Sequence, residues 1–460
     1  MFETIRNAFK IKDVRKKILM TIMFLIIFRL GCYITIPGLA KIELSGGMDI
    51  FGLLDSITGS ALSQGTLFSL GISPYINASI IVQLLTVAIP ALERMSKEGD
   101  EGREKINKIT RWVTLVLSII SAVGIFLTLR NTEGYVNTAW LGGQFASFFA
   151  TTGGQWIMGI YIVLMLVGGS MLTMWIGERI TEFGVSNGIS LLIFTGIIAT
   201  AAQQLVSTLG NGNWIEALIF VVELVLIFGF IVWVDGAERK IKVQYAKQVK
   251  GNKMYGGQST FIPIKVNASG VMPLIFAYAL MSFPQMLIST FWSTSDFAKW
   301  WNTWMTATQT GLYGVAGDVV GVIVYNVILA ILIFLFAYFY SQIQFNPVEI
   351  SRNIQNNGGF VTGIRPGRET AEYLQRVISR ITLWGAIFLA IIAFIPSILF
   401  QLPSWVGLTS QASGLISSFS TTGMLICVSV ALEFDKALEN QILMRHYKGL
   451  LGSNKKGFLG

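Results

Sequence analysis

The sequence predicts an all-α membrane protein whose chain crosses the bilayer ten times. Three observations favour this fold class: the composition is apolar, the apolar residues form runs of membrane-spanning length, and the basic residues gather in particular connecting segments. Of the 460 residues, 53% are hydrophobic and 13% are charged, whereas a soluble globular chain carries about 25% charged residues. The composition therefore excludes a water-soluble enzyme.

The apolar runs define the expected helices. A helix needs about 20 mostly apolar residues to cross the hydrocarbon core of a bilayer. We expect spans at 18–37, 72–92, 110–130, 154–177, 185–208, 215–235, 271–292, 317–340, 379–400 and 411–432. Residues 1–17 are polar and basic and the first run is of full length, so we expect it to remain in the protein as a span.

The basic residues predict the orientation, because Lys and Arg near the ends of spans are retained in the cytoplasm. Thirty of the 34 lie before the first span, after the last span, or between spans two and three, four and five, six and seven, or eight and nine. Both termini are therefore expected in the cytoplasm. This basic face would attract anionic lipid, RNA or an acidic protein; topology alone would explain about half of these charges.

The inventory of reactive side chains argues against catalysis. The two cysteines, Cys32 and Cys427, lie in apolar runs, and the single histidine, His446, lies in the polar C-terminal tail. These residues cannot supply a His/Cys metal site or a Ser-His-Asp triad. No nucleotide-binding Gly-x-x-x-x-Gly-Lys-Ser/Thr loop occurs. We therefore expect no catalytic residue, metal or cofactor.

Two cytoplasmic loops, 236–270 and 341–378, are long and patterned. In the first, polar and apolar residues alternate over 240–245 and again over 262–266, with a turn expected at 255–258, which predicts a hairpin. In the second, Asn346-Pro347 closes a span, 356–359 forms a turn, and 363–368 forms a basic tip. Loops of this length are uncommon unless they are functional, although plain solvated loops would also fit.

The segment between the first two spans breaks the pattern. It is rich in Gly and Ser over 59–65, too polar to face lipid and too apolar for an open loop. Backbone of this kind is tolerated at membrane depth only where protein buries it or where it lines a cavity. We expect a short re-entrant piece inside the bundle; a loop on the extracellular surface is the alternative.

Four segments resemble the SecY family of protein-translocation channel subunits. They are GISPYINASII (71–81), WIGERITEFGVSNGIS (175–190), QST followed by PIKVN (258–260 and 263–267), and GIRPG (363–367). The resemblance runs from about residue 10 to residue 440 with the order of ten spans intact. It implies a clamshell of two inverted-repeat halves of five helices, residues 1–208 and 209–440, followed by a tail at 441–460.

The resemblance also implies a pore between the halves. A ring of bulky aliphatic side chains narrows it, and a short plug helix, about 55–66, closes its outer side. Aligned by motif, the ring falls on Ile72, Ile76, Ile189, Ile193, Ile275 and Ile426. The plug falls on Ser56, Ile57, Thr58, Gly59, Ser60, Ala61, Leu62 and Ser63. The i, i+4 spacing of the isoleucines is by itself common in membrane helices, so this assignment depends on the alignment.

A lateral opening toward lipid is the next implied feature, between spans two and three on one side and seven and eight on the other. Three polar residues in these apolar runs, Gln83, Thr86 and Asn326, could hold such a seam through interhelical hydrogen bonds. Ordinary contacts between helices are an equal alternative for them. Arg29 and Glu223 are charges within spans, normally a sign of function; we expect them to be structural or to contact a partner.

The resemblance supplies the expected partners. They are the SecA motor ATPase and the ribosome, through its RNA, on the basic loops, the small subunits SecE and SecG, the signal sequences of precursor proteins, and anionic lipids. Arg365 is the principal docking residue, with Arg239, Lys240, Lys247, Lys250 and Arg368 in support; a role in topology alone would also explain the supporting charges.

The predicted function is a protein-conducting channel. It would pass unfolded secretory proteins across the membrane and release membrane helices sideways, with energy from an external motor or the ribosome. A ten-span secondary transporter is the main alternative, because it would use Arg29 and Glu223 as ligands for a substrate or ion. A structural membrane scaffold is a third possibility.

Overall fold

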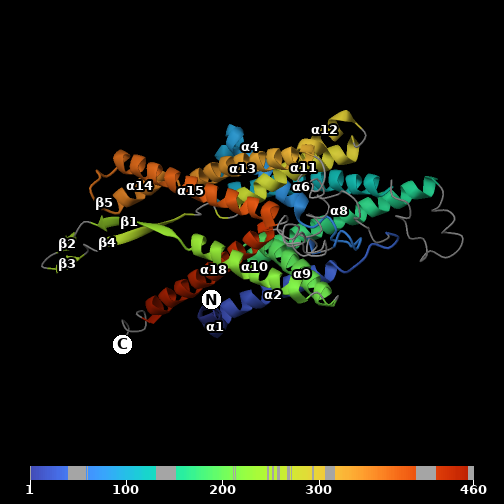
Figure 1. Cartoon of the computed structure of the whole chain (residues 1–460). Helices are drawn as coiled ribbons and strands as arrows, with labels where there is room; N and C mark the ends of the chain where they lie inside the picture. Colours follow the sequence, from blue (N-terminus) through green and yellow to red (C-terminus); the bar gives the residue numbers. More distant parts are fainter. Residues whose placement is uncertain are drawn as a thin grey trace.

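The computed structural model describes most of the chain. The described residues are 2–39, 58–59, 61–130, 152–210, 212, 214–245, 248–250, 253–255, 259–266, 270, 272–292, 295–305, 316–399 and 421–453. Helices dominate this part of the molecule, and the few strands gather at one end (Figure 1). The all-α membrane architecture agrees with the prediction.

Each predicted apolar run overlaps, in order, a described helix, although residues 411–420 of the last run lie outside the described residues. These helices are α2 (Lys12–Gly31), α4 (Ser73–Ala88) with α5 (Pro90–Lys97), α6 (Asp100–Arg130), α8 (Thr152–Phe183), α9 (Gly188–Gly210), α10 (Trp214–Asp235), α11 (Met272–Phe291), α13 (Ala316–Gln344), α15 (Arg368–Leu399) and α18 (Thr421–Ser453). Among the described residues, five helices are long and apolar enough by themselves to cross a membrane, or six when the bent pair α4–α5 is one span.

The helices at the first and second predicted spans differ from the prediction. At the first span, α2 ends at Gly31 rather than at residue 37. Residues 32–39 are apolar but not helical, because Pro37 and Gly38 (φ 90°) break the helix and Thr35 pairs with Thr66 in an isolated antiparallel bridge. The second span bends by 105° between α4 and α5. Ile89 precedes Pro90 and is extended (φ −106°, ψ 113°), the conformation that a following proline favours.

The long helices form a closed circuit around one apolar core. Along the circuit α4 packs on α6, α6 on α8, α8 on α9, α9 on α18, α18 on α15, α15 on α13, and α13 on α11. Helix α11 then closes the circuit by packing on α4 and α6. Among the described residues, the halves predicted for 1–208 and 209–440 therefore meet on two sides. On one side α9, α1 and α2 contact α18 and α9 contacts α10; on the other, α11 contacts α4 and α6. The division itself remains a prediction.

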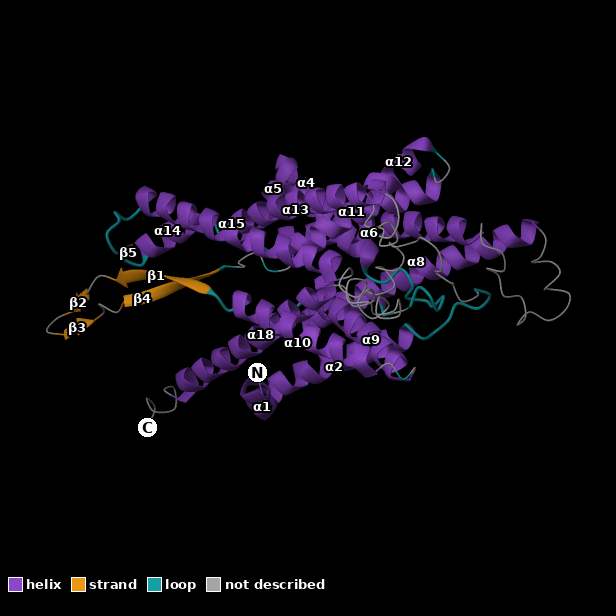
Figure 2. Cartoon of the chain, viewed as in Figure 1, coloured by secondary structure: helices purple, strands orange, loops and turns teal. Residues whose placement is uncertain are grey.

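The first of the loops predicted to be cytoplasmic forms a small sheet with one strand of the second, which confirms the predicted pairing of 240–245 with 262–266 (Figure 2). Strand β1 (Glu238–Tyr245) lies between β4 (Ser259–Lys265) and β5 (Gly359–Val361) and is antiparallel to both. The turn predicted at 255–258 is wrong in part, because Tyr255 ends β3 (Lys253–Tyr255) and pairs with Gln248 of β2 (Gln248–Lys250). The rest of that turn, 256–258, lies outside the described residues.

The sheet carries its own apolar core. Ile241 and Val243 of β1 are buried together with Ile264 of β4 and Val361 of β5. They pack on Ile354 of α14 (Pro347–Asn356) and on the first half of α15, at Leu374, Val377, Ile378 and Ile381. The two cytoplasmic loops predicted to be patterned thus fold as one unit on the end of α15.

Two further short helices complete the described chain. Helix α1 (Phe2–Lys10) precedes α2 and contacts α18, with Ala8 and Leu438 fully buried between them. Helix α12 (Asp296–Met305) packs on α11 and α13 at the end of the molecule opposite the strands (Figure 1).

Candidate functional site

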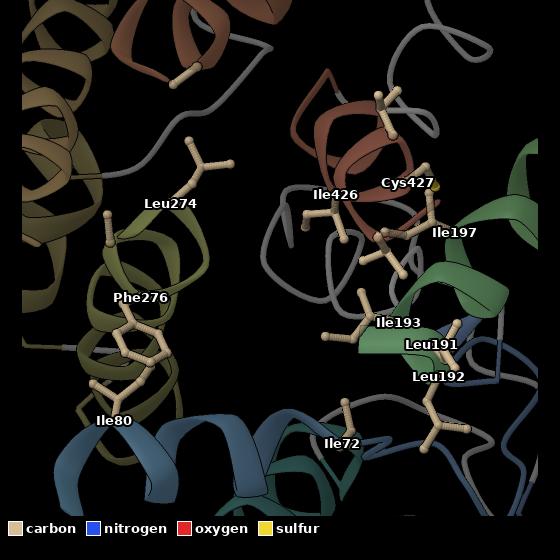
Figure 3. Packing of buried hydrophobic residues seen from close by; sticks show 14 of the residues in the cluster. Ile72, Ile80, Leu191, Leu192, Ile193, Ile197, Leu274, Phe276, Ile426 and Cys427 are labelled. Atoms are coloured by element: carbon tan, nitrogen blue, oxygen red, sulfur yellow. The ribbon is translucent and has the colours of Figure 1, made fainter. Parts of the chain in front are cut away.

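The six predicted ring isoleucines belong to one apolar cluster. Ile72, Ile193 and Ile426 are buried in it, and Ile76, Ile189 and Ile275 are half-buried and pack against it. They come from α4 and its N-cap, α9, α11 and α18. In Figure 3, Ile72, Ile193 and Ile426 lie along one side of the view and Leu274 and Phe276 of α11 on the other. The structure brings these residues together; their role in a pore remains a prediction.

Local interactions fix where α9 begins and so where Ile189 and Ile193 lie. The Asn187 side chain accepts a hydrogen bond from the backbone N–H of Ile189 at 3.0 Å, which caps the helix. The backbone N–H of Gly188 donates to Thr181 Oγ1 at 2.8 Å. A Cβ atom at Gly188 would stand 2.0 Å from the carbonyl oxygen of Gly177. Only glycine permits this close approach of α9 to α8.

The described part of the predicted plug is buried, so the alternative of a surface loop is wrong for these residues. Thr58, Ala61 and Leu62 are at most 2% exposed, and Ser63 is half-buried. Residues 61–71 form successive turns rather than the expected helix, because Gly65 (φ 62°) and Gly71 (φ 54°) adopt left-handed backbone. The predicted plug residues Ser56, Ile57 and Ser60 lie outside the described residues.

Backbone pairing ties the plug segment to the chain that follows α2. The N–H of Ile36 donates to the carbonyl of Gly65 at 2.9 Å, and the N–H of Leu67 donates to the carbonyl of Ile34 at 2.8 Å. The apolar residues beyond Gly31 therefore serve as a support for residues 61–67 and do not extend the first span.

Gln83, one of the three predicted seam residues, joins the two predicted halves through a hydrogen bond between α4 and α13. The Tyr340 hydroxyl donates a hydrogen bond to Gln83 Oε1, and Gln83 Nε2 donates to Ser79 Oγ at 3.1 Å on its own helix. The Tyr340 ring meets the Phe276 ring of α11 edge-on at 5.1 Å. Tyr340 was not identified from the sequence, because a tyrosine near the end of an apolar run carries no distinguishing signal.

The other two seam residues behave differently. Thr86 Oγ1 donates to the carbonyl of Gln83 at 2.6 Å, a bond within α4, so the expectation of an interhelical hydrogen bond from Thr86 is wrong. A threonine hydroxyl in a helix readily bonds a carbonyl of the preceding turn. Asn326 is buried on α13, with 7% of its surface exposed.

The predicted docking residues lie on the sheet and the adjoining tip. Arg239 and Lys240 are exposed on β1, and Arg365 is exposed between β5 and α15. The Thr370 hydroxyl donates to the carbonyl of Arg365 at 2.8 Å, which fixes the backbone of the tip. Arg368 is the first residue of α15 and pairs with Glu372 at 2.9 Å. Lys247 lies outside the described residues, as does the side chain of Lys250.

Two basic residues on the sheet were missed in the sequence. Lys242 is exposed on the same face of β1 as Lys240, because residues two apart in a strand share a face. Lys265 ends β4 near Lys436 of α18, whose Nζ lies 3.9 Å from Asp235 Oδ2. Partial burial, and then the neighbouring Lys436, lower the pKa of Lys265. The alternation over 240–245 could have identified Lys242; no local pattern predicts the meeting of Lys265 with α18.

Of the groups considered as reactive, the structure describes the side chains of Arg29 and of both cysteines. The Arg29 guanidinium carbon lies 5.7 Å from the centroid of the Tyr33 ring, and Glu223 lies on α10 with its side chain outside the described residues. Cys32 and Cys427 are both free and buried. In the ranges that the structure describes, no three His, Cys, Asp or Glu residues gather as metal ligands would.

Comparisons with known proteins agree with this arrangement. The SecY family model matches residues 66–434. The chain is similar to the protein translocase subunits SecY of Thermotoga maritima, at 37% identity with 99% of each chain covered, and of Streptomyces coelicolor, at 38% identity with 98% of this chain and 100% of that protein covered. The subunit of Thermus thermophilus is 36% identical, again over 99% of both.

Solved structures share the fold. One is a protein-conducting channel, with a TM-score of 0.63 and 19% identity over 93% of this chain and 92% of that one. Another is canine Sec61 in a ribosome–channel complex from the endoplasmic reticulum, with a TM-score of 0.58 and 18% identity over the same shares of each chain. The chain is a multi-pass membrane protein, and it belongs to the SecY family.

Proposed function

We propose that this chain is the protein-conducting subunit of a translocase. The observation that carries the proposal is the meeting of six isoleucines from four helices in one cluster, inside a closed circuit of long helices, in a chain of the SecY family. The curated relatives are named as protein translocase subunits. Neither the described geometry nor the comparisons favour a secondary transporter, the main alternative.

The ring explains how such a channel could stay closed to ions and still pass a polypeptide. An apolar constriction holds water poorly and gates by dewetting. Aliphatic side chains contact a passing chain through many weak dispersion contacts and bind no single side chain strongly. We propose Ile72, Ile76, Ile189, Ile193, Ile275 and Ile426 as this constriction, with the segment near 55–66 as its plug.

A lateral seam between α4 and α6 on one side and α11 and α13 on the other would release apolar segments into lipid. The polar contact of Gln83 with Tyr340 supports this location, because it is a single hydrogen bond that can part and reform. Partition of a signal sequence or membrane helix then follows from transfer free energies of a few tenths of a kcal/mol per apolar residue. Asn326 and Thr86 would line the same seam.

The proposed partners bind the cytoplasmic sheet and tip. Of the solved relatives, canine Sec61 is in a ribosome–channel complex and yeast Ssh1 is bound to the 80S ribosome. By analogy we propose that Arg365, supported by Arg239, Lys240, Lys242 and Arg368, contacts ribosomal RNA or the SecA motor ATPase. SecE and SecG would lie beside the helices, in a plasma membrane with both termini of the chain in the cytoplasm. The chain would perform no catalysis itself.

The decisive experiment is reconstitution. The chain is placed in vesicles with SecE and SecG, SecA and ATP are added outside, and a secretory precursor is tested for protection from protease. Protected precursor that depends on ATP is expected. If no precursor enters while a radiolabelled small solute accumulates, the channel proposal is wrong and the transporter alternative is correct. Vesicles lacking only this chain provide the matched control.

A further inference from the structure

Arg29 places a cation next to the predicted plug. It lies in the last turn of α2, within an apolar helix whose neighbouring residue Leu30 is 61% exposed. An arginine at membrane depth is costly and is normally retained for a function. The Arg29 Nη1 atom is buried and has no hydrogen-bond acceptor among the described residues. Nor does an ion pair join this guanidinium to a carboxylate in the described part of the chain.

The buried Arg29 Nη1 atom occupies the space that a side chain at plug residue 59 would need. A Cβ atom built at Gly59 would lie 2.2 Å from Arg29 Nη1 and 3.3 Å from the carbonyl oxygen of Gly196 on α9. Gly59 also has left-handed backbone (φ +73°), which disfavours any residue with a Cβ. Helix α2, the plug segment and helix α9 therefore meet at one point, and the guanidinium fills it.

A second contact from α2 reaches the preceding plug residue. The Cys32 thiol lies 3.7 Å from the carbonyl oxygen of Thr58, within reach of a weak S–H donor. Thr58 itself is 2% exposed. Two successive plug residues thus lie against the end of α2. Thr58 contacts Cys32 through its carbonyl oxygen, and Gly59 packs against Arg29 because it has no side chain.

We propose, building on the channel function above, that Arg29 is a positioning residue for the plug, whose guanidinium seats Gly59 between α2 and α9 in the closed channel. The planar guanidinium is weakly hydrated and stacks on aromatic rings, as it does over Tyr33. It therefore fits a narrow space from which the strongly hydrated ammonium group of a lysine would withdraw. Because the described residues give Arg29 no ion pair that has to break, the contact at Gly59 can part when a precursor displaces the plug and can form again.

The first test introduces the missing methyl group. Gly59→Ala in the full-length chain, reconstituted with SecE in planar bilayers, is expected to raise the resting ion conductance about tenfold, since overpacking of a tight site changes equilibria by that order. Gly212→Ala is the matched control. Gly212 has the same kind of backbone (φ +80°) but open space around its Cβ position, so it should leave the conductance unchanged.

The second test asks whether Arg29 is the cause. Arg29→Met should raise resting conductance, Arg29→Lys should behave like Arg29→Met, and Leu30→Met on the exposed side of the same turn should not. In the Arg29→Met background, the further rise caused by Gly59→Ala should be at least about threefold smaller, as for other residues in contact. Each variant is first shown to translocate a precursor with SecA and ATP, which establishes that it is folded and inserted.

The outcomes separate this proposal from the function on which it depends. If Gly59→Ala and Arg29→Met act independently, or if Arg29→Lys matches the wild type, the positioning role of the guanidinium is refuted. Deletion of 56–65 is the reference. If that deletion raises conductance and the Arg29 variants do not, only the role of Arg29 is overturned. If the deletion itself leaves conductance at the wild-type level, the plug assignment and this proposal both fail.

Discussion

The hydrogen bond between Tyr340 and Gln83 gives the sharpest test of the proposed lateral seam. Tyr340→Phe removes only the hydroxyl that donates to Gln83 Oε1. The ring remains, together with its edge contact to Phe276 at 5.1 Å. The change therefore removes one polar link between α4 and α13 and leaves the apolar packing of the seam in place.

The expected magnitude follows from measured bonds of this kind. Hydrogen bonds between membrane helices contribute about 0.6 kcal/mol on average, which corresponds to about a threefold change in an equilibrium constant. Gln83 is half-buried, so water can reach its freed oxygen and the penalty for leaving it unpaired is small. We expect Tyr340→Phe to favour the open seam about threefold, with little change in overall stability.

The assay should make seam opening rate-limiting. A precursor whose signal sequence has fewer apolar residues gains less free energy on entering lipid, so its initial rate of translocation depends more on how readily the seam parts. That rate should rise about threefold in Tyr340→Phe. Tyr338→Phe is the matched control, because the Tyr338 hydroxyl donates to the carbonyl of Ser379 at 3.3 Å, between α13 and α15 of one half.

A double-mutant cycle decides the question. If the bond carries the effect, Gln83→Leu and Tyr340→Phe together should act about as either does alone, because each change removes the same interaction. Additive effects, or an equal rise in Tyr338→Phe, would show that loss of a tyrosine hydroxyl acts elsewhere. The reasoning would then be refuted even if the lateral seam exists.

Three further predictions concern other parts of the molecule. Ile193→Asn should raise the resting ion conductance, because a polar side chain hydrates a constriction that otherwise gates by dewetting. Ile198→Asn, on the 44%-exposed side of α9, should leave the conductance unchanged. Arg365→Glu should abolish SecA-driven translocation although the protein is still folded and inserted. The control variant Arg352→Glu, at an exposed residue of α14, should support normal translocation. An equal loss in both variants would indicate a general effect of charge. Because the pKa of Lys265 is lowered from 10.5 in the folded state, its contribution should make the protein more stable as pH rises through the folded pKa toward 10.5 and less stable below it. Thermal unfolding of Lys265→Met should lack that alkaline gain, and identical pH profiles would contradict the assignment.

The order of the long apolar helices could be predicted because a membrane requires long apolar runs, whereas the count of ten spans remains a prediction. Their ends were less predictable, since hydropathy does not report backbone geometry. Residues 32–39 are as apolar as a span, yet Gly38 and the bridge of Thr35 to Thr66 take them out of the helix. The bend at Ile89 had a readable signal in Pro90, because the residue before a proline avoids helical backbone.

Some residues of the candidate site could likewise be identified from the sequence, and others could not. The isoleucine ring came from alignment to a family, and the structure then placed all six residues in one cluster. The resemblance proposed Arg239 and Lys240 as docking residues, and the strand alternation that places them on β1 also indicates Lys242. The partner of Gln83 could not be found locally, because Tyr340 lies 257 positions away and only the closing of the helix circuit brings the two together.

The two junctions between the predicted halves differ in chemistry, and this difference suggests which one opens. At the first junction, α9 meets α18 through buried apolar side chains, with Ile193 and Ile197 in the same cluster as Ile426 and Cys427. Separating them would expose a continuous apolar surface to any water in the pore, and that cost grows with area. At the second junction, Ile80 of α4 belongs to the same buried apolar cluster as Phe276 of α11, and Gln83 of α4 accepts a hydrogen bond from Tyr340 of α13.

If the second junction is the proposed lateral seam, it faces lipid when it parts, so apolar side chains there lose little by exchanging protein neighbours for acyl chains. The free-energy difference between its closed and open forms is then set mainly by one polar contact, which an entering signal sequence can offset by partition of a few apolar residues. A seam held in this way should open in proportion to the hydrophobicity of the segment presented to it. In Tyr340→Phe, the threshold hydrophobicity for lateral release should fall by about one to two apolar residues; an unchanged threshold would place the gate at the junction of α9 with α18.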